Sequence, residues 1–98
     1  MTQAEDFDTL LDFFRALSDA NRLRLVGLLT QAPRTVEQLA AEVDLSPSTV
    51  SHHLKRLAEL GLVTATANGH YHVYALQSER LDAMSGLLRE FTQREQEL

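Results

Sequence analysis

Side chains able to contact another molecule are concentrated in one short stretch near the middle of this 98-residue chain. The candidate contacts in this stretch are four hydroxyls, one of its two imidazoles and two cations: Ser46, Ser48, Thr49, Ser51, His52, Lys55 and Arg56. Hydroxyl and imidazole groups can donate to and accept from base edges, and lysine or arginine can bind phosphate or guanine. No acid stands among them before Glu59, so the stretch is typical of a surface that faces an anion such as DNA.

The rest of the chain offers little material for catalysis or metal binding. It has no cysteine, no nucleophile–base constellation and no glycine-rich phosphate loop. His52 and His53 lie about 100° apart on a helix and cannot chelate one ion together. His70 and His72 share a strand face and could hold a metal with a carboxylate, but a DNA contact from His70 and a partly buried His72 are favoured. We therefore expect neither an enzyme nor a bound metal or cofactor.

Charge is distributed unevenly in a chain whose net charge is −5. Residues 1–19 carry −4 and residues 77–98 carry −2, whereas residues 20–76 carry +1. Acidic ends around a slightly basic middle suit a molecule with one anion-facing side, although random scatter on a solvated surface would give the same totals. The chain shows no run near the ~18 apolar residues of a membrane span and no export signal. We expect a single cytoplasmic domain over residues 1–98.

The polar stretch belongs to the second of two helices that capping residues delimit. Thr35 to Gln38 forms a capping box that opens a short helix, and Ser46 followed by Pro47 opens the next. Three residues separate these helices, which predicts a helix-turn-helix over residues 35–60. In this arrangement the second helix enters the major groove with its N-terminal side chains on base edges.

Alternating hydrophobicity after Gly61 predicts a hairpin, or wing, over residues 62–76. Its two strands are joined by Asn68-Gly69, a strong turn signal because both residues of a type I′ turn adopt positive φ. At the wing tip we expect DNA contacts from Asn68, Gly69 and His70.

The register of this hairpin follows from its turn. A two-residue turn at Asn68-Gly69 pairs Ala67 with His70 and Val63 with Tyr74. Val63, Tyr74 and Leu76 then share one face, which we expect to be the inner one.

Two amphipathic helices flank this central part, over residues 6–17 and 78–93, each with apolar residues at 3-4-3 spacing. Ser18 and Asp19 are cap-type residues that start a further helix, which continues to about Leu29. The predicted order is α-α-α-α-β-β-α, a mainly α winged helix-turn-helix with a small β-hairpin. A core this small can form without extra helices. The apolar stripes on the two flanking helices therefore predict a surface that packs against a partner. Its expected members are Phe7, Leu10, Phe14, Leu81, Met84, Leu88 and Phe91.

Three segments resemble the ArsR/SmtB family of winged-helix transcriptional repressors: Phe14 to Leu25, Leu45 to Val63 and Gly69 to Leu76. The likeness covers roughly residues 7 to 91, and Ser51-His-His-Leu-Lys55 is fairly specific within it. The resemblance implies a homodimeric bacterial repressor that binds a palindromic operator in double-stranded DNA and leaves it when a signal arrives. In that family the first and last helices form the dimer interface, which agrees with the two apolar stripes.

Departures from the family's metal sensors bear on the signal. Many relatives carry cysteines at the start of the helix before the recognition helix, where this chain has Thr35 to Leu39. Others use histidine and carboxylate ligands from the last helix, which here holds acids and no histidine; carboxylates alone make a poor zinc or nickel site. Metal sensing is therefore not carried over. A hydrophobic pocket between the terminal helices could instead take a small-molecule inducer.

Two classes of function remain open at this point. The first is a sequence-specific, dimeric DNA-binding repressor, which the residues on the second helix of the motif favour. The alternative is a winged-helix protein-interaction or dimerisation module without specific DNA binding, which the net charge of −5 favours.

Overall fold

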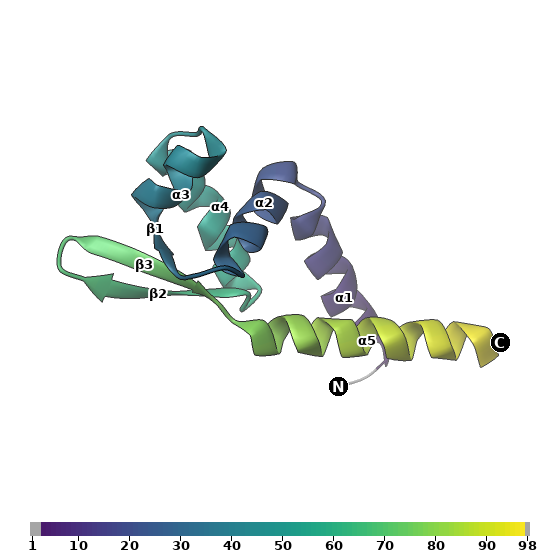
Figure 1. Cartoon of the computed structure of the whole chain (residues 1–98). Helices are drawn as coiled ribbons and strands as arrows, with labels where there is room; N and C mark the ends of the chain where they lie inside the picture. Colours follow the sequence, from purple (N-terminus) through teal and green to yellow (C-terminus); the bar gives the residue numbers. More distant parts are fainter. Residues whose placement is uncertain (1–2, 98) are drawn as a thin grey trace.

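A computed structural model describes residues 3–97, in which five helices accompany a three-stranded antiparallel sheet (Figure 1). In chain order the elements are α1 (Gln3–Leu17), α2 (Ala20–Leu29), β1 (Arg34–Thr35), α3 (Val36–Val43), α4 (Pro47–Glu59), β2 (Val63–Asn68), β3 (Tyr71–Leu76) and α5 (Ser78–Glu97). The winged helix-turn-helix is confirmed, with the short strand β1 as an addition. Within the described residues, no helix is both long and apolar enough to cross a membrane.

Side-chain caps fix where α2 and α3 begin. The Asp19 carboxylate accepts hydrogen bonds from the backbone N–H groups of Asn21 and Arg22 at 2.9 and 3.1 Å. The Thr35 hydroxyl accepts from the Gln38 N–H at 3.1 Å, and the Gln38 side chain accepts from the Thr35 N–H at 2.9 Å. These bonds satisfy N–H groups that have no partner inside the first helical turn. The predicted capping box is confirmed.

Removing the Asp19 cap is expected to lower the free energy of unfolding by about 1 kcal/mol at pH 7, the usual size for Asp→Ala at this position. The bond from the Arg22 N–H is the main cause that lowers the pKa of Asp19 below its ordinary 3.8, against an opposing effect of burial. A lowered folded-state pKa means that the charge stabilises the fold above the unfolded pKa. This contribution is lost as pH falls through the folded pKa.

Urea unfolding of the wild type and Asp19→Ala from pH 7 to about pH 3 measures this dependence. The difference between the two should shrink towards the acid end, as protonation removes the charged cap from the wild type. Asp8→Ala serves as the control, because Asp8 is an exposed acid that caps no helix. A difference that stays constant down to pH 3 would show that the charge of Asp19 contributes nothing.

The core lies between α2, α3, α4 and the beginning of β2. Its largest fully buried side chains are aliphatic: Leu25, Leu39, Val50, Leu54, Leu57, Leu62 and Val63. Three of them come from α4, at the spacing of four and then three residues that marks one helix face. Because that face is filled by the core, the opposite face of α4 is left to solvent.

The hairpin closes one residue later than predicted. The last pair joins Asn68 to Tyr71, so Gly69 and His70 form the turn. Gly69 has a φ of +64°, whereas His70 is not among the residues with positive φ. Glycine with positive φ at the first turn position is the pattern of a type II′ turn. The prediction of an Asn68-Gly69 turn is wrong, because the observed turn needs only the glycine, and not Asn68, to take the unfavourable conformation.

The faces of the hairpin nevertheless remain as predicted. Each residue changes its partner by two positions, and such a shift keeps the alternation of side chains. Val63 lies opposite Leu76, and Ala65 lies opposite Tyr74. Val63 is 2% exposed, while Tyr74 and Leu76 pack against the core as half-buried residues. The inner face is therefore the expected one.

Strand β1 escapes sequence-based prediction because two residues carry no periodicity. Arg34 pairs with Tyr74 and Thr35 pairs with Val73, which places β3 in the middle of the sheet. Thr35 also caps α3, so the same residue joins the wing to the first helix of the helix-turn-helix. The wing is thereby held at a fixed position relative to α3.

Candidate nucleic-acid interface

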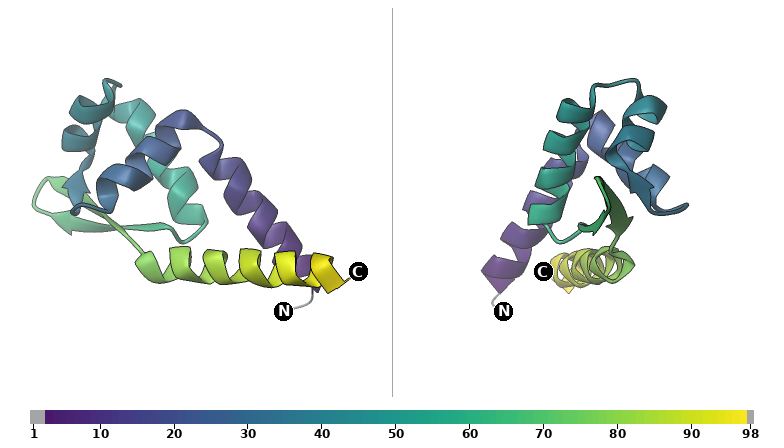
Figure 2. Two further views of the ribbon diagram at one scale, coloured as in Figure 1. Left: turned by 45° about the vertical axis from the view of Figure 1, so that its right-hand side comes forward. Right: turned by 90° about the vertical axis from the view of Figure 1, so that its left-hand side faces the viewer.

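A three-residue turn over 44–46 joins α3 to α4. Asp44 adopts a left-handed conformation, with φ 56° and ψ 49°, which aspartate tolerates better than most residues. The Leu45 N–H donates to the Ala40 carbonyl at 3.1 Å, and the Leu45 side chain packs on the core. In the view along α5, α3 and α4 lie side by side above the hairpin (Figure 2). The predicted helix-turn-helix is therefore present, and α4 is its second helix.

Hydroxyl groups gather at the N-terminus of α4. The Ser46 oxygen accepts from the Thr49 N–H at 3.2 Å, so it caps the helix as predicted. The same oxygen lies 3.2 Å from the Ser48 hydroxyl and 2.8 Å from the Thr49 hydroxyl. A helix N-terminus carries partial positive charge and free N–H groups, which favour a phosphate. This end of α4 can thus accept an anion and present two further hydroxyls beside it.

The outward face of α4 holds most of the predicted contact residues. Ser48, Thr49, His52 and Lys55 are exposed, and Ser51 is half-buried. They lie opposite the side chains that fill the core. The face therefore offers hydroxyls and an imidazole for base edges, and one lysine for phosphate, without an acid in its first three turns.

His53 occupies a different position from His52. It is half-buried, and its Nδ1 lies 3.4 Å from Nη1 of Arg22 on α2. Arg22 also donates from Nε to the Ala16 carbonyl at 2.7 Å, at the end of α1. Arg22 thus links α1, α2 and α4.

Arg56 is separated from the other predicted contacts by its partners. It donates from Nη2 to Oδ1 of Asp12 at 2.7 Å and from Nη1 to Oε2 of Glu59 at 3.4 Å. The bond to Asp12 is the main cause that raises the pKa of Arg56 above its ordinary value. Sequence reasoning missed Asp12, because a partner 44 residues away leaves no local signal.

The wing tip carries the other predicted contacts, and it lies at the end of the molecule opposite the C-terminal end of α5 (Figure 1). Asn68, Gly69 and His70 are all exposed there. The expectation of a partly buried His72 is wrong, because the residue is exposed on the open part of the hairpin. His70 lies in the turn, so the two histidines do not share a strand face as expected. Over residues 3–97, no three histidine or acidic side chains are grouped as a metal site.

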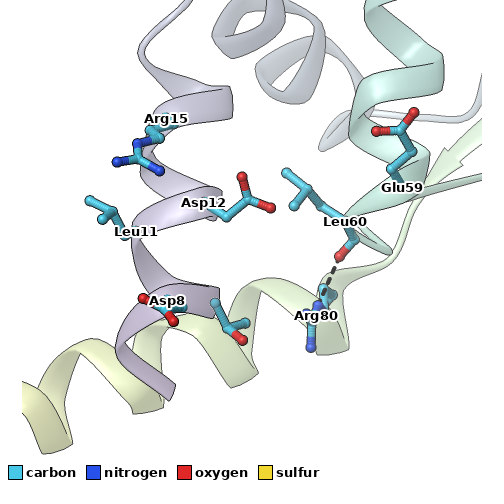
Figure 3. Close-up of a pocket in the computed structure, with 8 residues that line it drawn as sticks. Asp8, Leu11, Asp12, Arg15, Glu59, Leu60 and Arg80 are labelled. Carbon is cyan, nitrogen blue, oxygen red and sulfur yellow. Dashed lines mark hydrogen bonds between the residues drawn. The ribbon is translucent and has the colours of Figure 1, made fainter. Parts of the chain in front are cut away.

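A cavity of about 460 Å³ lies between α1, the end of α4 and the start of α5 (Figure 3). Its walls are mostly charged or polar: Asp8, Thr9, Leu11, Asp12, Arg15, Glu59, Leu60 and Arg80. Arg80 closes one side by donating from Nε to the Leu60 carbonyl at 2.9 Å. This cavity is not the hydrophobic pocket that we expected between the terminal helices, because charged residues of α1 face it.

The terminal helices carry apolar side chains on two sides. Leu10 and Met84 are 5% and 2% exposed, so they are buried within one chain and offer no surface to a partner. Phe7, Phe14 and Leu88 are 44%, 44% and 38% exposed, and we call these three residues the terminal surface. The Leu81 and Phe91 side chains are half-buried. Periodicity alone could not separate the inward side of each helix from the outward side.

The rings of Phe7 and Phe91 lie 5.5 Å apart between their centroids. This contact joins α1 to α5 next to the terminal surface. Phe7, which belongs to the terminal surface, is therefore in contact with both helices.

The arrangement of α3, α4 and the hairpin defines a winged helix-turn-helix domain. Residues 19–65 match the model of the bacterial regulatory protein, arsR family. The chain belongs to the arsR family of bacterial regulatory proteins. An arsenical resistance operon repressor of Staphylococcus xylosus is 36% identical over 76 residues, which cover 78% of this chain and 73% of that protein.

Other relatives and solved structures agree with this family. The cadmium resistance transcriptional regulatory protein CadC of Listeria innocua is 35% identical over 79 residues, covering 78% of this chain and 66% of its own. A homodimeric winged helix-turn-helix DNA-binding domain from Mycobacterium bovis superposes with a TM-score of 0.74 at 26% identity, covering 95% of this chain and 85% of that one. An ArsR-like regulator from Rhodococcus sp. RHA1 shares the fold, with a TM-score of 0.83 at 24% identity and coverage of 93% and 86%.

Proposed function

We propose that this chain is a homodimeric transcriptional repressor that binds a palindromic operator through α4 and leaves it on a signal. The outward face of α4 carries the proposal, because hydroxyl, imidazole and ammonium groups are exposed there beside a capped helix N-terminus. Relatives named as repressors of resistance operons support the regulatory role. A regulator of this kind acts where the chromosome is, in the bacterial cytoplasm.

Each exposed group on α4 has a role that its chemistry suggests. Ser48, Thr49, Ser51 and His52 reach base edges from the first half of the helix, where a recognition helix reads sequence. Lys55 binds phosphate as a point charge. At the wing, Asn68, Gly69 and His70 contact the backbone or the adjacent minor groove, as the exposed tip of a hairpin permits.

Dimerisation supplies the second half of the operator contact. The terminal surface of Phe7, Phe14 and Leu88 exposes aromatic and aliphatic area that a second copy would cover. A two-fold axis would set two copies of α4 about 34–36 Å apart, which is one turn of DNA. The M. bovis neighbour is homodimeric, which supports this arrangement. We therefore propose an inverted repeat whose half-sites are about 10 base pairs apart.

The signal that releases this chain from its operator is not a metal ion bound by cysteine thiolates. The names of several relatives refer to arsenical, cadmium or mercury resistance. These 98 residues contain no cysteine and cannot build a thiolate site. We propose a small-molecule inducer for this chain.

Selection from fragmented genomic DNA of the source at about 100 mM salt tests the proposal. We expect enrichment of one inverted repeat upstream of a few genes. Uniform retention would contradict a specific operator under these conditions. Absence of retention by an intact dimer would contradict DNA binding and favour an interaction module.

Substitutions on α4 should separate base contacts from phosphate contacts. His52→Ala is expected to relax preference at its base pair by about 1–3 kcal/mol, the usual cost of one mismatched contact. Lys55→Ala should weaken all sequences alike and reduce the slope of log affinity against log salt by about 1.8, or 0.9 for each protomer. Titrations of operator and scrambled DNA at several salt concentrations measure both effects. Altered base preference in Lys55→Ala with intact preference in His52→Ala would reverse these roles.

A further inference from the structure

Arg56 differs from the other side chains of α4 in what it touches. Its guanidinium binds Asp12 at 2.7 Å and Glu59 at 3.4 Å, and its side chain is 31% exposed. Lys55, one residue earlier, is exposed and has no ion pair within the described residues. We propose that Arg56 is a positioning residue that ties α4 to α1 through Asp12, and that it does not contact DNA. The inference rests on the proposed function, because it concerns how α4 is held against an operator.

The ion pair crosses a place where the helices are not closely packed. Helix α1 packs against α2 and α5, while the cavity of about 460 Å³ separates it from the last turn of α4 (Figure 3). Asp12 and Glu59, the two acids that bind Arg56, both line this cavity. Because side-chain packing is interrupted there, the bond between Arg56 and Asp12 sets the distance between α1 and the end of α4.

The place of Arg56 along α4 also separates it from the reading end of the helix. Arg56 lies in the last turn, about 12 Å along the axis from Ser48. A recognition helix contacts base edges with its N-terminal residues. Holding the last turn against α1 therefore fixes the direction in which the first turn projects.

The ion pair also connects two surfaces of the proposed repressor. Asp12 lies on the side of α1 that faces away from Phe7 and Phe14, about 140° and 160° from them around the helix axis. A second copy that packs on α1 would thus set the position of the helix to which α4 is tied. The bond between Arg56 and Asp12, together with the contacts of Arg22 with Ala16 and His53, therefore couples dimer geometry to the placement of α4.

Asp12→Asn tests this role without altering α4. A partly exposed ion pair contributes at most about fivefold to an equilibrium, so losing one in each protomer should weaken operator binding by about 3-fold to 25-fold. Asp8→Asn is the matched control, because Asp8 lies one turn earlier on α1, lines the same cavity and has no ion pair within the described residues. We expect its affinity to stay within about twofold of the wild type. Unchanged or tighter binding by Asp12→Asn would overturn the proposal.

A charge exchange separates positioning from phosphate contact. Arg56→Asp breaks the pair, and adding Asp12→Arg restores it with reversed polarity. If Arg56 positions α4, the double variant regains most of the affinity lost by Arg56→Asp, and Arg56→Gln keeps the wild-type salt slope. If Arg56 binds phosphate, the exchange restores nothing and the slope for Arg56→Gln falls by about 1.8. An exchange that restores no affinity, together with a reduced salt slope for Arg56→Gln, would overturn the proposal.

Wild-type binding is measured before any variant. Absence of binding by the wild type shows a failure of the proposed function and removes the inference with it. Binding that Asp12→Asn leaves unchanged shows a failure of the inference alone. Circular dichroism and sedimentation of every variant establish that it is folded and dimeric, so a loss of affinity in a folded dimer with recovery in the exchange supports the positioning role.

Discussion

Replacing Leu54 with alanine is expected to lower the free energy of unfolding by about 2–5 kcal/mol. Leu54 is 0% exposed and lies on the inward face of α4, so the truncation removes buried apolar area and leaves a cavity. The total free energy of unfolding of a domain is commonly only about 5–15 kcal/mol, so this loss is a large part of it. For a chain of about this length each kcal/mol lowers the melting temperature by about 4–8 °C.

Leu23→Ala is the matched control, because it deletes the same atoms from a side chain that is 54% exposed on α2. We expect that variant to remain within about 0.5 kcal/mol of the wild type. Thermal unfolding by circular dichroism at one protein concentration measures both, since a dimer's melting temperature depends on concentration. Equal losses in the two variants would contradict the position of Leu54 in the core.

Local signals made most of the fold predictable from the sequence. Asp19, Thr35 and Ser46 each accept bonds from N–H groups two or three residues later, so each cap and its helix start are encoded within four residues. Leu54 and its neighbours mark the inward face of α4 by helical spacing alone. The outward face, which carries the candidate contacts, is fixed as soon as the inward one is known.

Contacts between distant parts of the chain were not predictable in this way. Asp12 meets Arg56 only because α1 and α4 are brought together by the packing of α2, and nothing in either local sequence records that meeting. Leu10 belongs to the same 3-4-3 stripe of α1 as Phe7 and Phe14, yet Leu10 is buried and the two phenylalanines are exposed. In the stripe of α5, Met84 is likewise buried and Leu88 is exposed. A 3-4-3 stripe wide enough to face two directions does not say which side meets the core.

The wing tip shows a limit of a different kind. Asn68-Gly69 and Gly69-His70 are both turns that the sequence allows, because each places glycine where positive φ is needed. In the observed register Asn68 pairs with Tyr71, so β2 gains Asn68 at the turn and His70 is no longer part of β3. The difference between these turns is decided by strand pairing along the whole hairpin, so the turn residues alone do not determine the register.

Phe14→Glu is expected to convert the proposed dimer to a monomer and to weaken operator binding by about 100-fold to 10,000-fold. Phe14 is 44% exposed, and it lies on the same side of α1 as Phe7, two helical turns away. A carboxylate buried in an apolar interface would lose its water without gaining a partner, which costs several kcal/mol. Once the subunits separate, the second half-site no longer benefits from effective concentration, and this gain is commonly a factor of about 10²–10⁴.

Leu23→Glu is the control for this charge, because it places the same carboxylate on an exposed apolar residue of α2, away from the terminal helices. Sedimentation velocity should show a monomer for Phe14→Glu and a dimer for Leu23→Glu. The edge-to-face contact of Phe14 with Phe13, at 5.6 Å between ring centroids, contributes only about 0.5–1.5 kcal/mol beyond its buried area. The variant should therefore keep its helical circular dichroism. A folded Phe14→Glu dimer would refute the terminal surface as the contact between copies, and a folded monomer with full operator affinity would refute the need for two recognition helices.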